Sequence, residues 1–173
     1  MHIGICGQLG AGCTEVGEIL SRKLSMKCVN SSNIIKRLML SFGESFEGFE
    51  QRVRSGEVNL DRMIDGELDE MLSEGEMIVE GRSAFMLFNN QDVLLALLIA
   101  PERMRAEHVA KRRRISVDEA LEVVRESDEE RSSMVHRLFK KDWLDSRNYS
   151  LIINMDSRSY ETAADLLYKI IKK

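Results

Sequence analysis

The sequence of 173 residues contains little proline and no long apolar run. Pro101 is the single proline, which suits a helix-rich fold because proline interrupts helices. No apolar stretch approaches the roughly 20 residues of a membrane span. The longest candidate, Val93 to Ala100, has the length of a strand. Met1 leads directly into an apolar segment, so we expect neither a signal peptide nor a membrane partner.

Cysteine is also scarce. The three cysteines, Cys6, Cys13 and Cys28, are odd in number and lack the spacing of a zinc site, so we expect reduced thiols in the cytoplasm. The formal net charge of −4 argues against a general nucleic-acid binder. The length, with 31% charged and 43% hydrophobic residues, predicts one ordinary soluble domain with a full core.

One further residue is missing from a glycine-rich loop. Residues 7–14 read GQLGAGCT and lie between the apolar run HIGIC and apolar residues at helical spacing. A strand, a GxxxxG loop and a helix start in this order are typical of a phosphate-binding loop, although a plain tight turn is the alternative. The full pattern continues with Lys and Ser or Thr, but Cys13 stands at the lysine position before Thr14. We therefore expect nucleotide binding, with the missing cation supplied from elsewhere.

Five short apolar runs alternate with segments of helical periodicity. This alternation predicts a three-layer α/β fold with a five-stranded, mostly parallel sheet. Together with the glycine loop after the first run, it makes the P-loop NTPase fold the expected fold class. The expected strands are residues 3–6, 27–29, 77–80, 93–99 and 150–153. Two helical insertions stand out, at about residues 34–72 and 105–138, and Ser116 to Ala120 predicts a capping box within the second. Ligands bind such sheets at the carboxyl ends of the strands, where the informative polar residues follow.

Phosphoryl transfer requires mainly positioning and positive charge, which arginines supply well because they hold phosphate with two parallel hydrogen bonds. The candidate arginines are Arg82, Arg105, Arg112 and Arg131. A surface arginine is the plainer interpretation of Arg82, and a solvated helix face that of residues 111–114. Arg125, Asp128 and Arg131 recur at three-residue spacing, which is also typical of helix-stabilising charge pairs.

Magnesium has two candidate residues. Thr14 could hold the ion directly or through water, and Glu80 ends a buried strand beside the loop. The histidines show no metal-ligand spacing, so no other metal site is expected. Cys13 is best interpreted as a tolerated small side chain, because a catalytic thiol would need a base and no histidine is near it in sequence.

At this point the chain resembles a known family, the cytidylate kinases of the archaeal type and their cytidylate-kinase-like relatives, which are P-loop nucleoside monophosphate kinases. The loop GQLGAGCTE is similar to the family's lysine-less form, GxxGSGTTT. EGR at residues 80–82 matches the family's EGR, and APERMRAEHV at residues 100–109 resembles its APLEVRAERI. RISVDEA at residues 114–120 matches the start of the family's lid. The resemblance covers nearly the whole chain.

The resemblance implies transfer of a phosphoryl group from ATP to CMP or dCMP, giving ADP and CDP or dCDP. It implies ATP and Mg²⁺ as cofactors, small nucleotides as the partners, and a monomer or weak homodimer. The insertion at about 34–72 would bind the acceptor, and that at about 105–138 would be a helical lid. The implied catalytic residues are Arg82, Arg112 and Arg131, the last two closing over the transferring group.

The implied ATP-binding residues are Gly7, Gln8, Leu9, Gly10, Ala11, Gly12, Cys13, Thr14, Glu15 and Asn154, the last near adenine. The implied acceptor-binding residues are Ser32, Lys36, Arg37, Asp61, Arg62 and Arg82. Three of these positions depart from the family pattern. Lys36 replaces an arginine, Ser32 a glycine and Glu15 the third loop threonine. Glu15 is expected to point out from the first helical turn, where its charge favours the helix dipole; pointing inward it would repel phosphate.

Two other functions stay open on the sequence. One is a kinase of another small acceptor, such as AMP, UMP or a non-nucleotide, which the acceptor residues would decide. The other is a catalytically silent nucleotide-binding regulator, a hypothesis that Cys13, Glu15 and Lys36 keep open.

Overall fold

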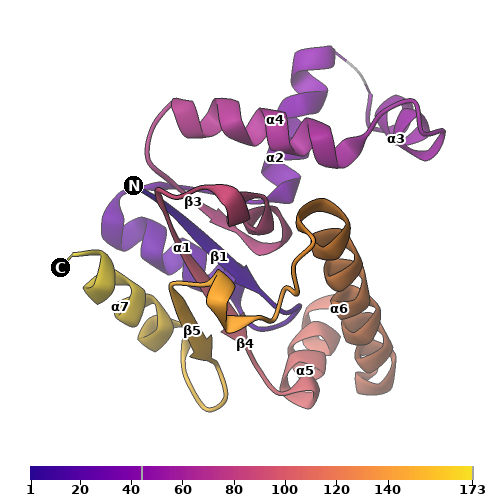
Figure 1. Ribbon diagram of the computed structural model, residues 1–173. Coiled ribbons are helices and arrows are strands. Elements are labelled where there is room, and N and C mark those ends of the chain that lie inside the picture. The colour runs from indigo at the N-terminus through magenta and orange to yellow at the C-terminus, as the bar shows by residue number, and fades with distance from the viewer. Residues whose placement is uncertain (44, 173) are drawn as a thin grey trace.

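The computed structural model describes residues 1–43 and 45–172, and a parallel sheet forms its centre (Figure 1). The strands are β1 (His2–Gly7), β2 (Lys27–Val29), β3 (Met77–Glu80), β4 (Val93–Ile99) and β5 (Leu151–Asn154). They pair in the order β2-β3-β1-β4-β5. The predicted fold class is confirmed, and so are the predicted strands, whose bounds differ by at most one residue at each end.

The central strand β1 positions the site. It lies between β3 and β4, and Ile5 is in register with Glu80 on one side and Ala96 on the other. Apart from His2, β1 and β4 are apolar because helices cover both faces of the sheet, as parallel sheets require. The carboxyl ends of β1 and β3 therefore meet at one edge, which brings Gly7 close to Glu80.

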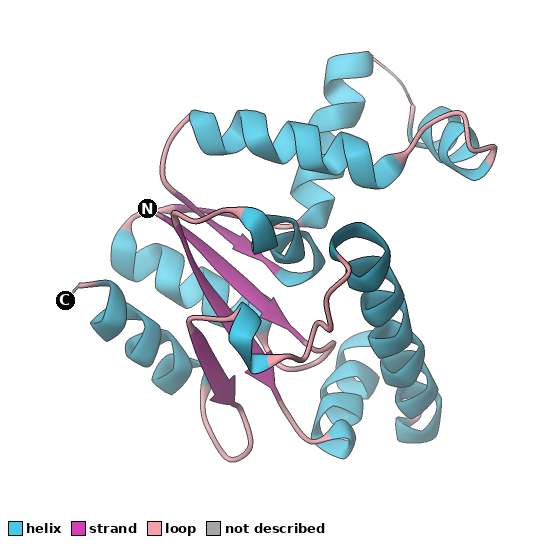
Figure 2. Ribbon diagram, in the orientation of Figure 1, coloured by secondary structure: helices cyan, strands magenta, loops and turns pink. Residues whose placement is uncertain are grey.

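Helices form a layer on each face of the sheet (Figure 2). They are α1 (Cys13–Leu24), α2 (Ser31–Phe42), α3 (Phe46–Arg54), α4 (Leu60–Ser73), α5 (Glu102–Arg113), α6 (Val117–Phe139) and α7 (Tyr160–Ile171). α1 and α7 pack on one face, around Val16, Leu20 and Leu167. The other face is covered by α2, α4, the end of α6 and a 3₁₀ helix (Gly81–Asn89) that was not predicted. Within the described residues, no helix is both long and apolar enough to span a membrane.

The α5–α6 hairpin has an apolar core of its own. Ala106, Val109 and Ala110 of α5 pack against Ala120 and Val124 of α6, apart from the two layers that cover the sheet. Small alanines at this contact let the helices approach closely. The hairpin projects beyond the sheet edge near the end of β4 (Figure 1).

The predicted capping box begins the second helix of this hairpin. Ser116 Oγ accepts a hydrogen bond from the Glu119 backbone N–H, and the Glu119 carboxylate accepts one from the Ser116 backbone N–H. These reciprocal bonds satisfy two backbone donors that the first turn leaves free.

Arg105 is bonded within the hairpin and does not line the cavity at the glycine loop, contrary to the prediction. Its Nε donates to the Ala100 carbonyl at 3.1 Å, and its two terminal nitrogens donate to the Asp128 carboxylate at 3.1 and 2.9 Å. Arg105 is only 3% exposed, because its face of α5 is turned towards α6. Side-chain direction on a helix depends on its neighbours, so the position of Arg105 near a strand end was not sufficient.

Candidate active site

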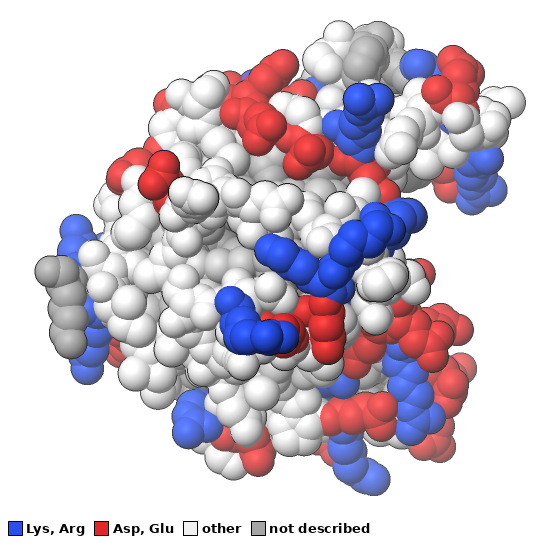
Figure 3. All heavy atoms as spheres, viewed as in Figure 1, with Lys and Arg blue, Asp and Glu red and all other residues white. Residues whose placement is uncertain are grey.

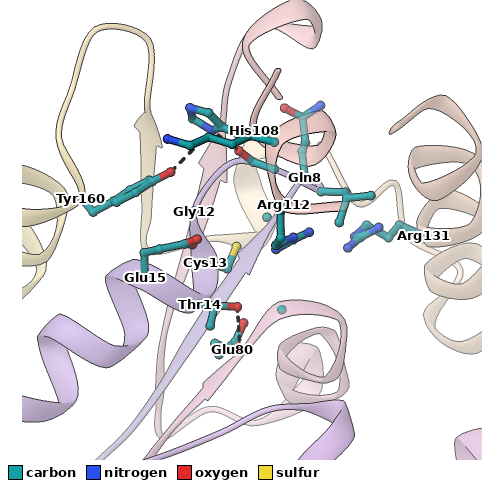
Figure 4. A pocket seen from close by; sticks show the side chains of 15 residues that line it. Gln8, Gly12, Cys13, Thr14, Glu15, Glu80, His108, Arg112, Arg131 and Tyr160 are labelled. Carbon is teal, nitrogen blue, oxygen red and sulfur yellow. Dashed lines mark hydrogen bonds between the residues drawn. The ribbon is translucent and has the colours of Figure 1, made fainter. Parts of the chain in front are cut away.

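The phosphate loop joins β1 to α1 at the carboxyl edge of the sheet (Figure 4). Gly12 is the N-cap of α1 and provides no side-chain cap, so the first-turn N–H groups remain available to a ligand. Two loop positions require glycine. Gly10 has φ 85°, and a Cβ there would lie 2.5 Å from the Arg105 carbonyl oxygen. Gly12 has φ 98°, and its Cβ would lie 2.4 Å from the Tyr160 ring.

Side chains from other elements hold the loop in place. Gln8 Oε1 accepts a hydrogen bond from the Ala100 backbone N–H at 3.1 Å, which ties the loop to the end of β4. His108 of α5 donates from Nδ1 to the Gly10 carbonyl at 2.9 Å, and the Tyr160 hydroxyl lies 3.5 Å from the same nitrogen. The loop is therefore fixed from the sheet and from α5 before any phosphate binds.

These contacts border a cavity of about 560 Å³, which we call the donor pocket. It is lined by Gly7, Gln8, Leu9, Gly10, Gly12, Cys13, Thr14, Glu15, Glu80, Gly81, His108, Lys111, Arg112, Arg131 and Tyr160. Two of the predicted ATP-binding residues, Ala11 and Asn154, lie outside this lining, and Ala11 is buried. The Asn154 Oδ1 instead accepts from the Asp156 backbone N–H at 3.0 Å, so a place near adenine stays a prediction.

His108 and Tyr160 were missed as site residues on the sequence. His108 was considered only as a metal ligand, and Tyr160 lies far along the chain from the loop. The usable signal was the position of Tyr160 at the start of the helix that follows the last strand, because the carboxyl ends of the strands meet at the site.

Thr14 and Glu80 form a hydrogen-bonded pair at the floor of the pocket. Thr14 Oγ1 donates to Glu80 Oε1 at 3.0 Å, and Asn30 Nδ2 donates to the same oxygen at 2.9 Å. Burial raises the pKa of Glu80, and these two hydrogen bonds partly oppose that shift. Because the Thr14 hydroxyl donates its hydrogen bond to Glu80, the lone pairs of Thr14 Oγ1 remain free to bind a cation. Hard oxygen donors of this kind fit Mg²⁺, whose remaining ligands would be phosphate oxygens and water.

Across the described residues, no group of three or more His, Cys, Asp or Glu side chains is arranged to hold a metal ion.

Cys13 occupies the lysine position as a buried, neutral thiol. It is 8% exposed, and its Sγ lies 2.3 Å from the point where a Cβ on Gly7 would stand. Burial, and after it the nearby Glu80 carboxylate, raise the pKa of the Cys13 thiol to about 12. The thiol is therefore protonated at neutral pH, which favours the interpretation of Cys13 as a small side chain over a nucleophile.

Glu15 lines the donor pocket, contrary to the expectation that it points away (Figure 4). Burial raises the pKa of Tyr160, and the charge of Glu15 raises it further. The same charge also contributes to the raised pKa values of Cys13 and Glu80. A carboxylate at this place opposes phosphate binding, so the pocket needs compensating cations.

The three charged residues at three-residue spacing on α6 separate in the structure, because each step of three turns the side chain by about 60°. Arg125 pairs with Glu102 and Glu122 at the surface, while Asp128 pairs with Arg105. Arg131 alone reaches the donor pocket. The helix-stabilising interpretation therefore holds for Arg125, and the phosphate-binding one stays a prediction for Arg131.

A second cavity of about 640 Å³, the acceptor cleft, lies beyond the donor pocket. It is lined by Ser31, Ile35, Leu60, Asp61, Ile64, Arg82, Ser83, Met86, Glu126, Glu129, Glu130, Ser133, Met134 and Arg137. Its arginines are both paired: Arg82 binds Glu130, and Arg137 binds Asp61. On the surface, basic and acidic side chains lie intermixed around the hollow between α4 and α6 (Figure 3).

The predicted acceptor residues are only partly brought together. Asp61 and Arg82 line the acceptor cleft, and Arg62 lines a neighbouring cavity of about 450 Å³. Ser32, Lys36 and Arg37 line neither cavity. On α2 the lining residues are instead Ser31 and Ile35, which share a face because they are four positions apart. Arg37 is turned towards α4 and pairs with Glu67 and Glu74.

A five-stranded parallel sheet, a glycine loop that opens a helix and arginines above that loop define a P-loop phosphotransferase. The model of the cytidylate kinase-like family matches residues 2–157. The chain therefore belongs to the cytidylate kinase-like family.

Relatives in archaea share this sequence over nearly its full length. The chain is 33% identical to the cytidylate kinase of Pyrococcus horikoshii, over 92% of this chain and 82% of that protein. It is 31% identical to the cytidylate kinase of Methanobrevibacter smithii, over 99% of each. Among solved structures, an uncharacterized protein from Eubacterium ventriosum superposes with a TM-score of 0.77 at 15% identity, over 100% of this chain and 99% of that one. Shikimate kinase from Bacteroides thetaiotaomicron superposes with a TM-score of 0.66 at 18% identity, over 100% of this chain and 99% of that one.

Proposed function

We propose that this protein is a cytidylate kinase, which transfers the γ-phosphoryl group of ATP to CMP or dCMP. The observation that supports this most directly is that the donor pocket and the acceptor cleft adjoin. Gly81 and Arg131 line the donor pocket, whereas their chain neighbours Arg82 and Glu130 line the acceptor cleft. Phosphates bound on the loop and at Arg82 would therefore face each other.

The chemistry needs little from the protein except position and charge. An oxygen of the acceptor phosphate forms a bond to the γ-phosphorus while the bond from that phosphorus to the β–γ bridging oxygen breaks, and ADP leaves with the electron pair. The acceptor phosphate is already an anion, so no general base is needed. Loop N–H groups would hold the donor phosphates, Arg82 the acceptor phosphate, and Arg112 and Arg131 the transferring group. Mg²⁺, when bound beside Thr14 and Glu80, would supply further positive charge to the phosphates.

The lining of the acceptor cleft favours an acceptor nucleotide whose nucleobase carries an amino group. Asp61, Glu126 and Glu129 are carboxylates that can only accept hydrogen bonds when ionised. The 4-amino group of cytosine is a donor, whereas uracil presents a carbonyl oxygen at that position. We expect these carboxylates to favour CMP over UMP, because a carboxylate accepts a hydrogen bond from the cytosine amino group but repels the carbonyl oxygen that uracil presents at the same position.

The helical insertions would complete the site. The α5–α6 hairpin, within residues 105–138, would act as a lid that excludes water, so that the acceptor phosphate rather than water attacks ATP. The segment of residues 34–72 would bind the acceptor, through α2 and α4. We expect the enzyme to act in the cytoplasm as a monomer or weak homodimer. The free thiols of Cys6, Cys13 and Cys28 are consistent with the cytoplasm.

The test is ADP formation from Mg-ATP with CMP, dCMP, UMP, AMP and GMP offered separately, beside a blank without acceptor. We expect fast turnover with CMP or dCMP and little with UMP. Turnover with AMP or UMP alone would make the protein a kinase of another acceptor. ATP binding without turnover on any acceptor would favour the silent regulator.

A further inference from the structure

We propose that Arg131 replaces the missing loop lysine, and that the small side chain of Cys13 makes room for it. The proposal rests on the donor pocket being the ATP site, as in the proposed function. It differs from a lid arginine that acts only during the transfer, because Arg131 would hold the phosphates of bound ATP before any acceptor arrives.

The first observation is the environment of Arg131. Its residue exposure is 7%, and Nη1 donates to the Ser127 carbonyl at 3.0 Å and to the Ser127 hydroxyl. Nε is buried without a hydrogen-bond partner. In the described part of the chain no carboxylate lies within ion-pair distance of this guanidinium. A buried cation held only by neutral groups is costly, and an anionic ligand in the pocket would offset that cost.

The second observation is its direction. The Arg131 guanidinium points into the donor pocket from the side opposite Tyr160, towards the loop and Cys13 (Figure 4). The two side chains are close enough that the Arg131 charge acts to lower the pKa values of both Cys13 and Cys6, against the larger effect of burial. Arg131 therefore brings positive charge to the part of the pocket where a loop lysine would begin.

The third observation is the packing of Cys13. Its Sγ is folded back against Gly7, so it takes little of the pocket. A lysine at position 13 would extend into the space that Arg131 faces, and two cations there would repel each other. A small residue at 13 and a buried arginine at 131 are then two parts of one arrangement. Lys111 and Arg112 line the same pocket, but both are exposed and so are less restrained.

The experiment measures Mg-ATP affinity by titration calorimetry, without acceptor, for Arg131→Met, Cys13→Lys and the double variant. We expect Arg131→Met to weaken ATP binding on the order of 10- to 100-fold, the range for loss of a charge-assisted hydrogen bond. Cys13→Lys alone should not increase the affinity for Mg-ATP, because the positive charge of Arg131 is already present. In the Arg131→Met background, Cys13→Lys should increase the affinity for Mg-ATP about tenfold or more. A double-mutant cycle isolates this coupling between the two positions.

Two further variants sharpen the result. Arg125→Met removes an exposed arginine from the same helix outside the pocket, and as the matched control it should change ATP affinity by no more than about fivefold, as for exposed charges. Lys111→Met removes the rival cation of the pocket, and a larger loss of ATP affinity in this variant than in Arg131→Met would overturn the proposal. Unchanged ATP affinity in Arg131→Met would overturn the proposal, even if turnover fell, because that result describes a residue used only in the transition state. Equal effects of Cys13→Lys in both backgrounds would also overturn it.

Thermal unfolding of each variant separates loss of binding from loss of fold. If Met at position 131 prevents folding, Arg131→Lys carries the test, since it keeps the charge but not the planar fork. It should weaken ATP binding with little change in the unfolding midpoint, and unchanged affinity would overturn the proposal. Failure of the proposed function is distinguishable, because a protein that binds ATP but does not phosphorylate CMP still reports on Arg131.

Discussion

The donor pocket and the acceptor cleft use arginine in opposite ways. In the donor pocket, Arg131 is buried with an unpartnered Nε, so its charge is ready for an anion. In the acceptor cleft, Arg82 is paired with Glu130 and Arg137 with Asp61, and both pairs are largely exposed. The donor pocket is therefore a prepared site, in which Arg131 has no carboxylate partner among the described residues, whereas the arginines of the acceptor cleft are bound to the protein's own carboxylates. If the acceptor phosphate binds Arg82 as proposed, it has to displace Glu130, whereas an ATP phosphate at Arg131 would displace no carboxylate.

The largest expected effect breaks the prepared site. Arg131→Ala should lower turnover at saturating substrate on the order of 10³-fold, the scale for an arginine that stabilises a transferring phosphoryl group. Steady-state ADP formation measures this. A rate like that of the unmodified protein would show that Arg131 does not face the reacting phosphate.

Arg82→Met should break the acceptor cleft alone. We expect kcat/KM for CMP to fall on the order of 100-fold, because one charge-assisted contact to phosphate is lost, while Mg-ATP affinity stays unchanged. Calorimetry with ATP and initial rates over a CMP series separate the two quantities. A parallel loss of ATP affinity would mean that the two cavities are not distinct binding sites.

Glu80→Gln should separate activity from stability. Burial raises the pKa of Glu80 above its ordinary value of 4.5, so the folded protein binds this proton more tightly than the unfolded chain. Stability is therefore lost as pH rises through the folded pKa, and the ionised carboxylate destabilises the protein at neutral pH. Gln keeps an acceptor for Thr14 and Asn30 without the charge.

We expect Glu80→Gln to raise the unfolding midpoint by a few degrees at pH 7 and much less at pH 4, while turnover falls about tenfold or more. Thermal unfolding at both pH values and ADP formation are the measurements. A lower midpoint at pH 7 would show that the carboxylate stabilises the fold.

Glu130→Gln should make the acceptor cleft resemble the prepared site. Release of Arg82 is expected to lower the KM for CMP by about 1.5- to 5-fold, the range for an exposed ion pair, with the KM for ATP unchanged. Glu122→Gln, whose carboxylate pairs with Arg125 outside both cavities, is the matched control. Equal effects of the two substitutions would mean that only the net charge of α6 matters.

Cys13→Ser should have the smallest effect, within about twofold on turnover, because a neutral small side chain is replaced by another. The raised pKa of the Cys13 thiol, about 12, leaves almost no thiolate at pH 7. Brief treatment with peroxide should therefore not inhibit the unmodified protein. Inhibition that Cys13→Ser abolishes would show that the thiol is reactive.

Features set by local sequence could be predicted, and features set by side-chain direction could not. The loop, the strand ends and the capping box at Ser116 follow from residue order and periodicity, and Glu80 was placed correctly beside Thr14. Arg105 was assigned to phosphate because it follows β4, yet its face of α5 is turned to Asp128. The sequence does not record which helix packs against which face.

The acceptor side was harder for the same reason. A shift of one residue on α2 turns the side chain by about 100°, which separates Ser31 and Ile35 from Ser32 and Lys36. His108 and Tyr160 come from distant elements, and no local pattern links them to Gly10.

The separate core of the α5–α6 hairpin has a consequence for how the protein opens. Because Ala106, Val109 and Val124 pack within the hairpin, α5 and the first half of α6 can move as one body. Met134 and Val135, at the end of α6, stay packed in the apolar layer on the sheet. The Arg105–Asp128 bond crosses from one helix to the other and would travel with the moving body. Amide hydrogen exchange should therefore find α5 and the first half of α6 losing protection together, as one cooperative unit, while the central strands and the end of α6 remain protected.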